Sequence, residues 1–117
     1  MKYIDLYLLP VPVAKFDDYV KQAQTFGDIL VECGGLGYGE FKIDQSDEGK
    51  STFYKLIEVK DDEILTSARA EFKSKAHHDE VMAKVMADPR IKTMLDLPAI
   101  ADMTRMTYCG FEQFVGA

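Results

Sequence analysis

Polar side chains that could do acid–base or anion-binding chemistry recur at even spacing in four segments of the chain. They are Asp5, Tyr7, Tyr38, Glu40, Arg69, Glu71, Tyr108 and Glu112. Side chains an even number of residues apart lie on the same face of an extended strand. A carboxyl group among other carboxylates can serve as a general acid or base, and arginine suits bidentate recognition of a carboxylate. We therefore treat these eight residues as candidate ligand-binding residues.

Two interpretations of this set stay open at the level of sequence. In the first, Arg69 forms a satisfied ion pair with a protein carboxylate and the tyrosines anchor a dimer interface. In the second, the same side chains line a small-molecule pocket, with Arg69 pairing an anionic group of the ligand.

Two adjacent histidines in the stretch AHHDE, His77 and His78, suggest a metal site at first sight. Adjacent residues diverge by about 100° on a helix, whereas helical zinc sites use histidines four positions apart. We therefore expect no metal site. His78 falls within an apolar helical stripe and is expected to pack on the sheet, whereas His77, at the edge of that stripe, joins the candidate pocket residues.

Four glycines lie within CGGLGYGE, at positions 34, 35, 37 and 39. A dinucleotide fingerprint places its glycines after a strand and before a helix, so that the helix N-terminus faces the pyrophosphate. Here the order is reversed, because the glycines follow a helical pattern and begin a strand. Gly34 suits the end of a helix, and no nucleotide cofactor is expected.

The elements that position these residues follow from periodicity. Strands are predicted over 2–9, 35–43, 64–73 and 104–115, and helices over 13–33 and 74–87, with a helical turn at 90–96. The segment 53–60 is ambiguous and favours a further short strand. Pro10 and Pro12 are expected to end the first strand, and Ser74 to cap the second helix. The order β-α-β-β-α-β predicts a ferredoxin-like α+β fold, with a four-stranded antiparallel sheet and two helices on one face.

Alternation divides the strands into two faces. The apolar or small face, which includes Ile4, Leu6 and Leu8, is expected under the helices. The tyrosine-rich polar face is then left bare, and so large a patch favours a homodimer formed through it. Because the first and third long strands are central neighbours in this topology, Asp5 and Tyr7 are expected beside Arg69 and Glu71.

Composition narrows the classes of partner. The 117 residues, expected to form one domain over 1–117, carry a net charge of −6, which argues against nucleic acid because phosphate contacts need clustered cations. No apolar run approaches the roughly 20 residues of a membrane span. Cys33 and Cys109 form no CxxC motif, no secretory signal is evident, and a cytoplasmic location is expected.

Four motifs together resemble a small bacterial family of unknown function in the dimeric α+β barrel superfamily. They are YIDLYLLPVP (3–12), AHHD (76–79), KVMADPR (84–90) and RMTYCGFE (105–112). The resemblance covers essentially the whole chain and implies two ferredoxin-like sheets that pair in a homodimer around a cavity. Related branches include cofactor-independent monooxygenases, muconolactone-isomerase-like enzymes and haem-degrading enzymes. The family has no established reaction, so the resemblance implies no catalytic residues.

Two functions of different class remain. The first is a small cofactor-independent enzyme, of oxidoreductase or isomerase type, acting on a small aromatic or anionic molecule. The second is a non-catalytic dimeric protein with a ligand-binding, regulatory or structural role. The sequence does not separate them.

Overall fold

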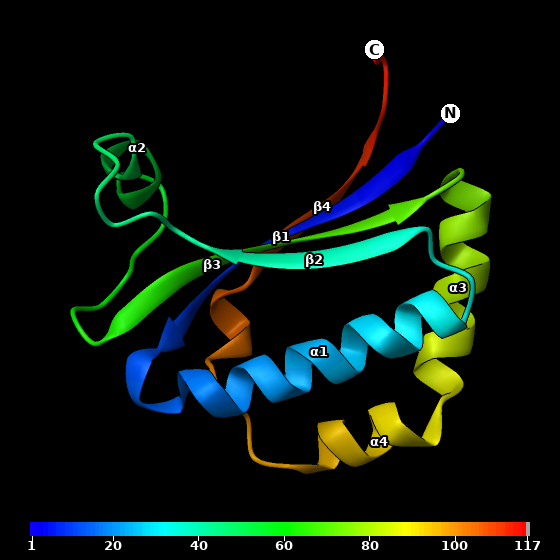
Figure 1. The fold of residues 1–117 in the computed structure, drawn as a ribbon, viewed down its shortest axis with the longest axis horizontal. Helices are drawn as coiled ribbons and strands as arrows, with labels where there is room; N and C mark the ends of the chain where they lie inside the picture. The colour runs from blue at the N-terminus through cyan, green and yellow to red at the C-terminus, as the bar shows by residue number, and fades with distance from the viewer. Residues whose placement is uncertain (117) are drawn as a thin grey trace.

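Four antiparallel strands form one sheet in the order β2-β3-β1-β4 in a computed structural model that describes residues 1–116. The strands are β1 (Tyr3–Pro12), β2 (Gly37–Lys42), β3 (Glu63–Phe72) and β4 (Thr107–Glu112). Figure 1 shows α1 (Phe16–Glu32), α3 (Lys75–Ala87) and α4 (Pro89–Asp96) on one side of this sheet. The ferredoxin-like α+β prediction is confirmed.

The helix ends follow the local sequence. A 3-10 turn over Val13–Lys15 leads into α1. Past its last turn, Gly34 adopts a φ of +110°, a conformation that glycine reaches at little cost and that turns the chain toward β2. At α3 the Ser74 hydroxyl accepts a hydrogen bond from the backbone N–H of His77, which is the expected cap.

The first strand runs further than expected, through Pro10 and Pro12. β4 pairs with β1 only from Tyr3 to Leu8, so the last residues of β1 have a neighbour on one side alone. The N–H of Val13 donates to the carbonyl of Asp62 in the neighbouring strand's turn, and alternation places the nitrogens of the two prolines on the free side. Proline is tolerated there because no ladder hydrogen bond is lost.

Three other expectations about elements need correction. The strand predicted over 53–60 is wrong: the short helix α2 (Lys50–Tyr54) and an irregular segment fill this connection. The turn expected at 90–96 is a full helix, α4, which Asp88 caps by accepting from the N–H of Arg90. The last strand is shorter than 104–115, because Met103–Arg105 forms a 3-10 turn before it.

The two faces of the sheet are reversed on three strands relative to the sequence prediction. Strand register places Asp5 beside Ala70 and Tyr7 beside Ala68, and both alanines are buried beneath the helices. The tyrosines of β1, β2 and β4 therefore lie on the same side of the sheet as the helices. The open face, meaning the sheet face without α1, α3 and α4, carries Ile4, Leu6, Leu8, Gly37, Gly39, Phe41, Ser67, Arg69, Glu71, Cys109 and Phe111.

The apolar core on the helix side is split into two clusters. The larger joins α1, α3 and α4 to the end of β3 through Ile29, Leu30, Ala70, Phe72, Val81, Val85 and Ile91. The smaller surrounds Leu9, Val11 and Ala101 at the other end of β1. Between the two clusters, the helix side of the sheet carries polar side chains.

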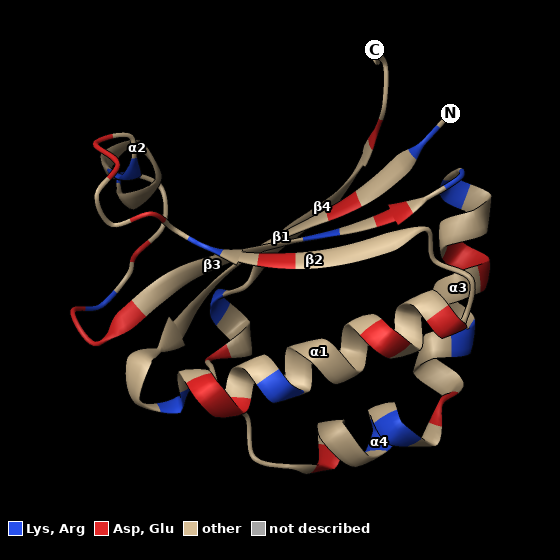
Figure 2. Ribbon diagram, viewed as in Figure 1, with Lys and Arg blue, Asp and Glu red and all other residues tan. Residues whose placement is uncertain are grey.

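Charged residues are dispersed over the molecule. Figure 2 shows Lys and Arg spread over the helices and strand ends, with Asp and Glu between them. Within residues 1–116, no helix has both the length and the apolar character needed to cross a bilayer.

Candidate functional site

A polar band crosses the helix side of the sheet between the two apolar clusters. It consists of Asp5 and Tyr7 on β1 and Tyr38 and Glu40 on β2. In the strand register, Ala70 separates Asp5 from Tyr38, and Ala68 separates Tyr7 from Glu40. The small alanine side chains leave room above β3 for the larger polar groups on either side.

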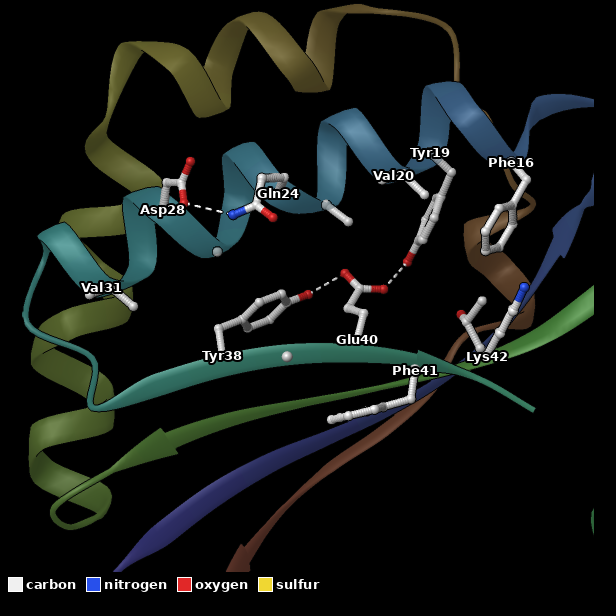
Figure 3. Close-up of a pocket in the computed structure, with 14 residues that line it drawn as sticks. Phe16, Tyr19, Val20, Gln24, Asp28, Val31, Tyr38, Glu40, Phe41 and Lys42 are labelled. Carbon is white, nitrogen blue, oxygen red and sulfur yellow. Dashed lines mark hydrogen bonds between the residues drawn. The ribbon is translucent and has the colours of Figure 1, made fainter. Parts of the chain in front are cut away.

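The centre of the β2 half of this band is the carboxylate of Glu40. The Tyr19 hydroxyl, from α1, donates to Glu40 Oε1 at 2.5 Å, and the Tyr38 hydroxyl donates to Oε2 at 2.5 Å. Figure 3 shows Tyr19 reaching down from the helix and Tyr38 and Glu40 reaching up from the strand. One carboxylate is thus held by two phenols from two different elements.

Burial is the main cause that raises the pKa of both phenols well above the ordinary value of 10, and the hydrogen bond to Glu40 adds to it. The pKa of Tyr7 is raised in the same direction, first by burial and then by the charge of Asp5. All three hydroxyls therefore keep their protons at neutral pH and act as donors toward the carboxylates.

The close approach of α1 to β2 depends on Gly27. A Cβ placed on Gly27 would lie 2.7 Å from a ring carbon of Tyr38, closer than real Cβ contacts allow. The same helical face carries Phe16, Tyr19 and Ala23 at spacings of three and four residues, so it lies over the strand as one surface. The helix therefore brings both a phenol and an apolar wall to Glu40.

A cavity of about 410 Å³ lies between α1 and β2 (Figure 3). Its walls are mainly apolar or aromatic from the helix and polar from the strands. The lining residues are Phe16, Tyr19, Val20, Ala23, Gln24, Gly27, Asp28, Val31, Tyr38, Gly39, Glu40, Phe41, Lys42 and Thr66.

The β1 half of the band is organised around the buried carboxylate of Asp5. Its Oδ2 accepts from the Tyr7 hydroxyl at 3.0 Å and lies 2.8 Å from Nε2 of His78 on α3. The other ring nitrogen of His78 lies 2.8 Å from Oδ1 of Asp79. His78 thus ties α3 to the sheet, as its place in the helical stripe predicts.

The structure brings together some of the predicted residues and separates others. Asp5, Tyr7, Tyr38 and Glu40 share the helix side, and Tyr108 stacks on Tyr7 with ring centroids 6.0 Å apart. The expected neighbourhood of Arg69 with Asp5 and Glu40 is wrong, because Arg69 lies beside Leu6 and Gly39 on the open face.

Of the nine predicted residues, Tyr38 and Glu40 line the cavity. The others lie outside it, and three besides Arg69 are also away from the polar band. Glu71 is on the open face, where Arg69 approaches it at 3.2 Å. Glu112 pairs with Tyr3 at the exposed end of β4. Nδ1 of His77 accepts from the backbone N–H of Lys73 at 3.0 Å, so it supports the start of α3. Among residues 1–116, no three His, Cys, Asp or Glu side chains converge on a common point suited to a metal ion.

Tyr19 is the contributor that the sequence analysis did not single out. It sits in the apolar stripe of α1 and is indistinguishable there from a core aromatic. The available signal is its hydroxyl: a tyrosine on the buried face of a helix needs a hydrogen-bond partner, and the only acceptors opposite are on the strands.

Comparison with known proteins identifies the family. Residues 2–102 match the family model described as "Protein of unknown function (DUF1428)". The chain belongs to the DUF1428 family. Its relatives include the uncharacterized protein YbaA of Escherichia coli K12 and of Shigella flexneri, each 30% identical over 116 residues and covering 98% of both chains. The predicted membership of a family of unknown function is confirmed.

Solved structures show the fold of this DUF1428 protein in distant proteins. A mutant form of SnoaB, a cofactor-independent oxygenase from Streptomyces nogalater, aligns with a TM-score of 0.55 at 12% identity, covering 98% of this chain and 95% of SnoaB. A dimeric ferredoxin-like protein from an uncultured marine organism aligns with a TM-score of 0.54 at 8% identity, covering 94% and 91%. At these identities the likeness carries the fold and no reaction.

Proposed function

We propose that this DUF1428 protein binds a small aromatic molecule in the cavity between α1 and β2. The observation that carries the proposal is the carboxylate of Glu40, held by Tyr19 and Tyr38 in the wall of a cavity of about 410 Å³. Cavities of roughly 300–1,000 Å³ with apolar walls and a few placed polar groups are typical of small-molecule sites.

The wall chemistry favours an aromatic ligand over an anionic one. Phe16, Val20 and Ala23 supply apolar surface, and Glu40 and Asp28 supply negative charge. Arg69, the cation that favoured an anionic ligand in the sequence analysis, lies on the open face instead. The proposal concerns binding alone, because the geometry of the cavity does not indicate a catalytic group.

The proposal is tested by filling the cavity. Ala23→Phe places a ring in the space a ligand needs, whereas Ala83→Phe adds the same ring at an exposed position of α3. A panel of single-ring aromatic molecules, screened by thermal shift and by two-dimensional NMR, is expected to stabilise the wild type and Ala83→Phe but not Ala23→Phe. A panel without effect on the wild type at millimolar concentration contradicts the proposal, as does equal stabilisation of both variants.

We further propose that the protein is a homodimer formed through the open face. This interface replaces the one predicted through the tyrosine-rich face, because the residues of that face on β1 and β2 pack beneath the helices. Leu6, Phe41 and Phe111 are 36%, 59% and 50% exposed there, although they are large and apolar. Contiguous patches of this kind are rare on monomers. The dimeric ferredoxin-like structure of the same fold supports pairing.

Two apolar extensions support the same geometry. In Figure 1, α2 and the chain after β4 both project from the sheet on the side opposite α1. Leu56, just past α2, is 86% exposed and Phe114 is 91% exposed. A second copy seated on the open face is in position to cover both.

The assembly is tested by charge insertion. Leu6→Glu is expected to convert a species of twice the 13.2 kDa chain mass into a monomer in sedimentation velocity at micromolar concentration. Leu95→Glu, at a residue of α4 that is 68% exposed, is the matched control and should leave the dimer intact. A wild type that sediments as a monomer contradicts this assembly without affecting the cavity proposal.

A further inference from the structure

We propose that the cavity between α1 and β2 selects organic ammonium ions, that is, ligands whose aromatic body carries a protonated amine. This rests on the proposed function and names its ligand class. Among the described residues, the side chains of the inner wall present hydrogen-bond acceptors to a ligand and no free donor, as the following contacts indicate.

The donors of the inner wall are already used. The Tyr19 and Tyr38 hydroxyls each have one proton, and both protons go to Glu40. Thr66, also a lining residue, donates its hydroxyl proton to the carbonyl of Leu9 at 2.8 Å. Each of these oxygens is left with lone pairs alone, so toward a ligand each acts as an acceptor.

The acceptors are not saturated. A carboxylate offers about four lone-pair sites, and the two tyrosines occupy two of those on Glu40. The inner wall therefore offers free acceptor sites to a ligand that carries a hydrogen-bond donor. An anion or a carbonyl-bearing ligand finds no partner at this point, because burying an acceptor against acceptors leaves both unpaired.

Charge distinguishes an ammonium ion from a neutral donor. Among residues 1–116, no lysine, arginine or histidine forms an ion pair with Glu40, although this carboxylate is partly buried. A neutral donor already makes a charge-assisted hydrogen bond to a carboxylate, and a cationic donor adds the Coulomb attraction of opposite charges, which is stronger in a partly buried site than in bulk water. A protonated amine supplies both the donor and the missing positive charge.

The aromatic walls act in the same direction. Phe16 and Tyr19 lie with ring centroids 6.4 Å apart, and Tyr38 lies on the other side of Glu40 (Figure 3). The faces of aromatic rings attract cations within about 6 Å. A ligand ammonium ion that lies over the face of one of these rings gains this attraction in addition to that of the Glu40 charge.

The donors that remain are at the exposed rim. Gln24 lies on the exposed side of α1 and directs one amide N–H to Asp28 at 2.8 Å. Lys42 is exposed at the end of β2, two positions after Glu40. Its positive charge opposes an ammonium ligand and favours an anion, so its removal gives the two ligand classes effects of opposite sign.

Three probes with the same ring separate the ligand classes: benzylamine, benzyl alcohol and benzoate, titrated by NMR at pH 7 and low ionic strength. Benzylamine is expected to bind about tenfold more tightly than benzyl alcohol, and benzoate more weakly than either. Glu40→Gln should remove the preference for the amine while the alcohol still binds. Asp28→Asn, which removes a negative charge from the exposed rim of the same cavity, should retain most of it.

Lys42→Met tests the charge preference, because the loss of this positive charge should tighten benzylamine binding and weaken benzoate binding. Equal affinity for benzylamine and benzyl alcohol, or preference for benzoate, overturns the ammonium assignment and leaves the cavity proposal standing. If no probe binds, the cavity proposal itself fails. Should Glu40→Gln not fold, as judged by circular dichroism, the wild-type ranking and the Lys42→Met response still decide.

Discussion

Each face of the sheet departs in part from the usual distribution of polar and apolar residues. On the helix side, Asp5 is only 8% exposed and, with Glu40, accepts hydrogen bonds from tyrosines of three elements. On the open face, Phe41 and Phe111 are at least half exposed. Antiparallel sheets with one solvated face ordinarily place apolar residues inward and polar residues outward.

The buried polar groups of the helix side are hydrogen-bonded within one chain, whereas the apolar groups of the open face are not buried within it. Within residues 1–116, every buried side-chain nitrogen or oxygen has at least one hydrogen-bond partner inside the chain. The large apolar side chains of the open face, in contrast, are left partly exposed by the described chain. The helix side carries both core clusters and the cavity, and the open face is the surface through which we propose that two chains pair.

The largest change in the free energy of unfolding is expected when one phenylalanine from each face is replaced and the two variants are compared. Phe72→Ala removes a side chain with no exposed surface from the larger core cluster, and a loss of about 3–5 kcal/mol in the free energy of unfolding is expected. Phe111→Ala, on the open face, should weaken dimerisation while changing the unfolding of the protomer by less than about 1 kcal/mol. Urea denaturation at several protein concentrations separates the two, and similar losses for both variants at low concentration contradict the division between faces.

The second effect concerns the two phenols on Glu40. Tyr38→Phe and Tyr19→Phe each remove a hydrogen bond to an ionised group, at a cost of about 1.5–3 kcal/mol. Tyr54→Phe is the matched control, because the Tyr54 hydroxyl makes only a 3.4 Å contact with Gln45 at the surface. A double-mutant cycle measures whether the two phenols are coupled through the shared carboxylate. Losses no greater than that of Tyr54→Phe show that Glu40 is merely solvated.

The third effect is the response of the same phenols to alkaline pH. Because folding raises the pKa of Tyr38, its contribution is complete below pH 10 and is lost as pH rises and the unfolded chain's tyrosine ionises. The stability gap between wild type and Tyr38→Phe should therefore narrow above about pH 10. Chemical denaturation from pH 8 to 11 measures the gap, and a gap that widens contradicts the assigned burial.

Sequence alone predicted the fold and, among the residues that line the cavity, Tyr38 and Glu40. The periodicity of the 13–33 and 74–87 segments and the alternation of 64–73 were enough for the strand and helix order, because these patterns are local. The pairing of Tyr38 with Glu40, and of Asp5 with Tyr7, was also within reach, since residues two apart share a strand face.

The assignment of faces was not predictable from those patterns. Alternation separates the residues of β1 into two sets but does not say which set lies under the helices, and here the usual hydrophobic criterion gave the wrong answer. The informative residues were Leu9 and Val11, which share the phase of Asp5 and Tyr7 and are 4% and 0% exposed. Ending the strand at Pro10 removed Val11 from consideration, and the cavity partner Tyr19 became visible only when α1 was placed over β2.

The smallest expected effect follows from that correction and concerns Arg69. If Arg69 formed a buried ion pair with a carboxylate, as one interpretation of the sequence has it, its replacement would cost about 3 kcal/mol. On the open face it is 54% exposed by its side chain and approaches a single carboxylate, Glu71, at 3.2 Å, while Lys2 lies 3.6 Å from the same group. Exposed pairs contribute about 0–1 kcal/mol. Arg69→Met should therefore leave the protomer's unfolding and benzyl alcohol binding nearly unchanged, and a large loss of either returns Arg69 to the neighbourhood of the cavity.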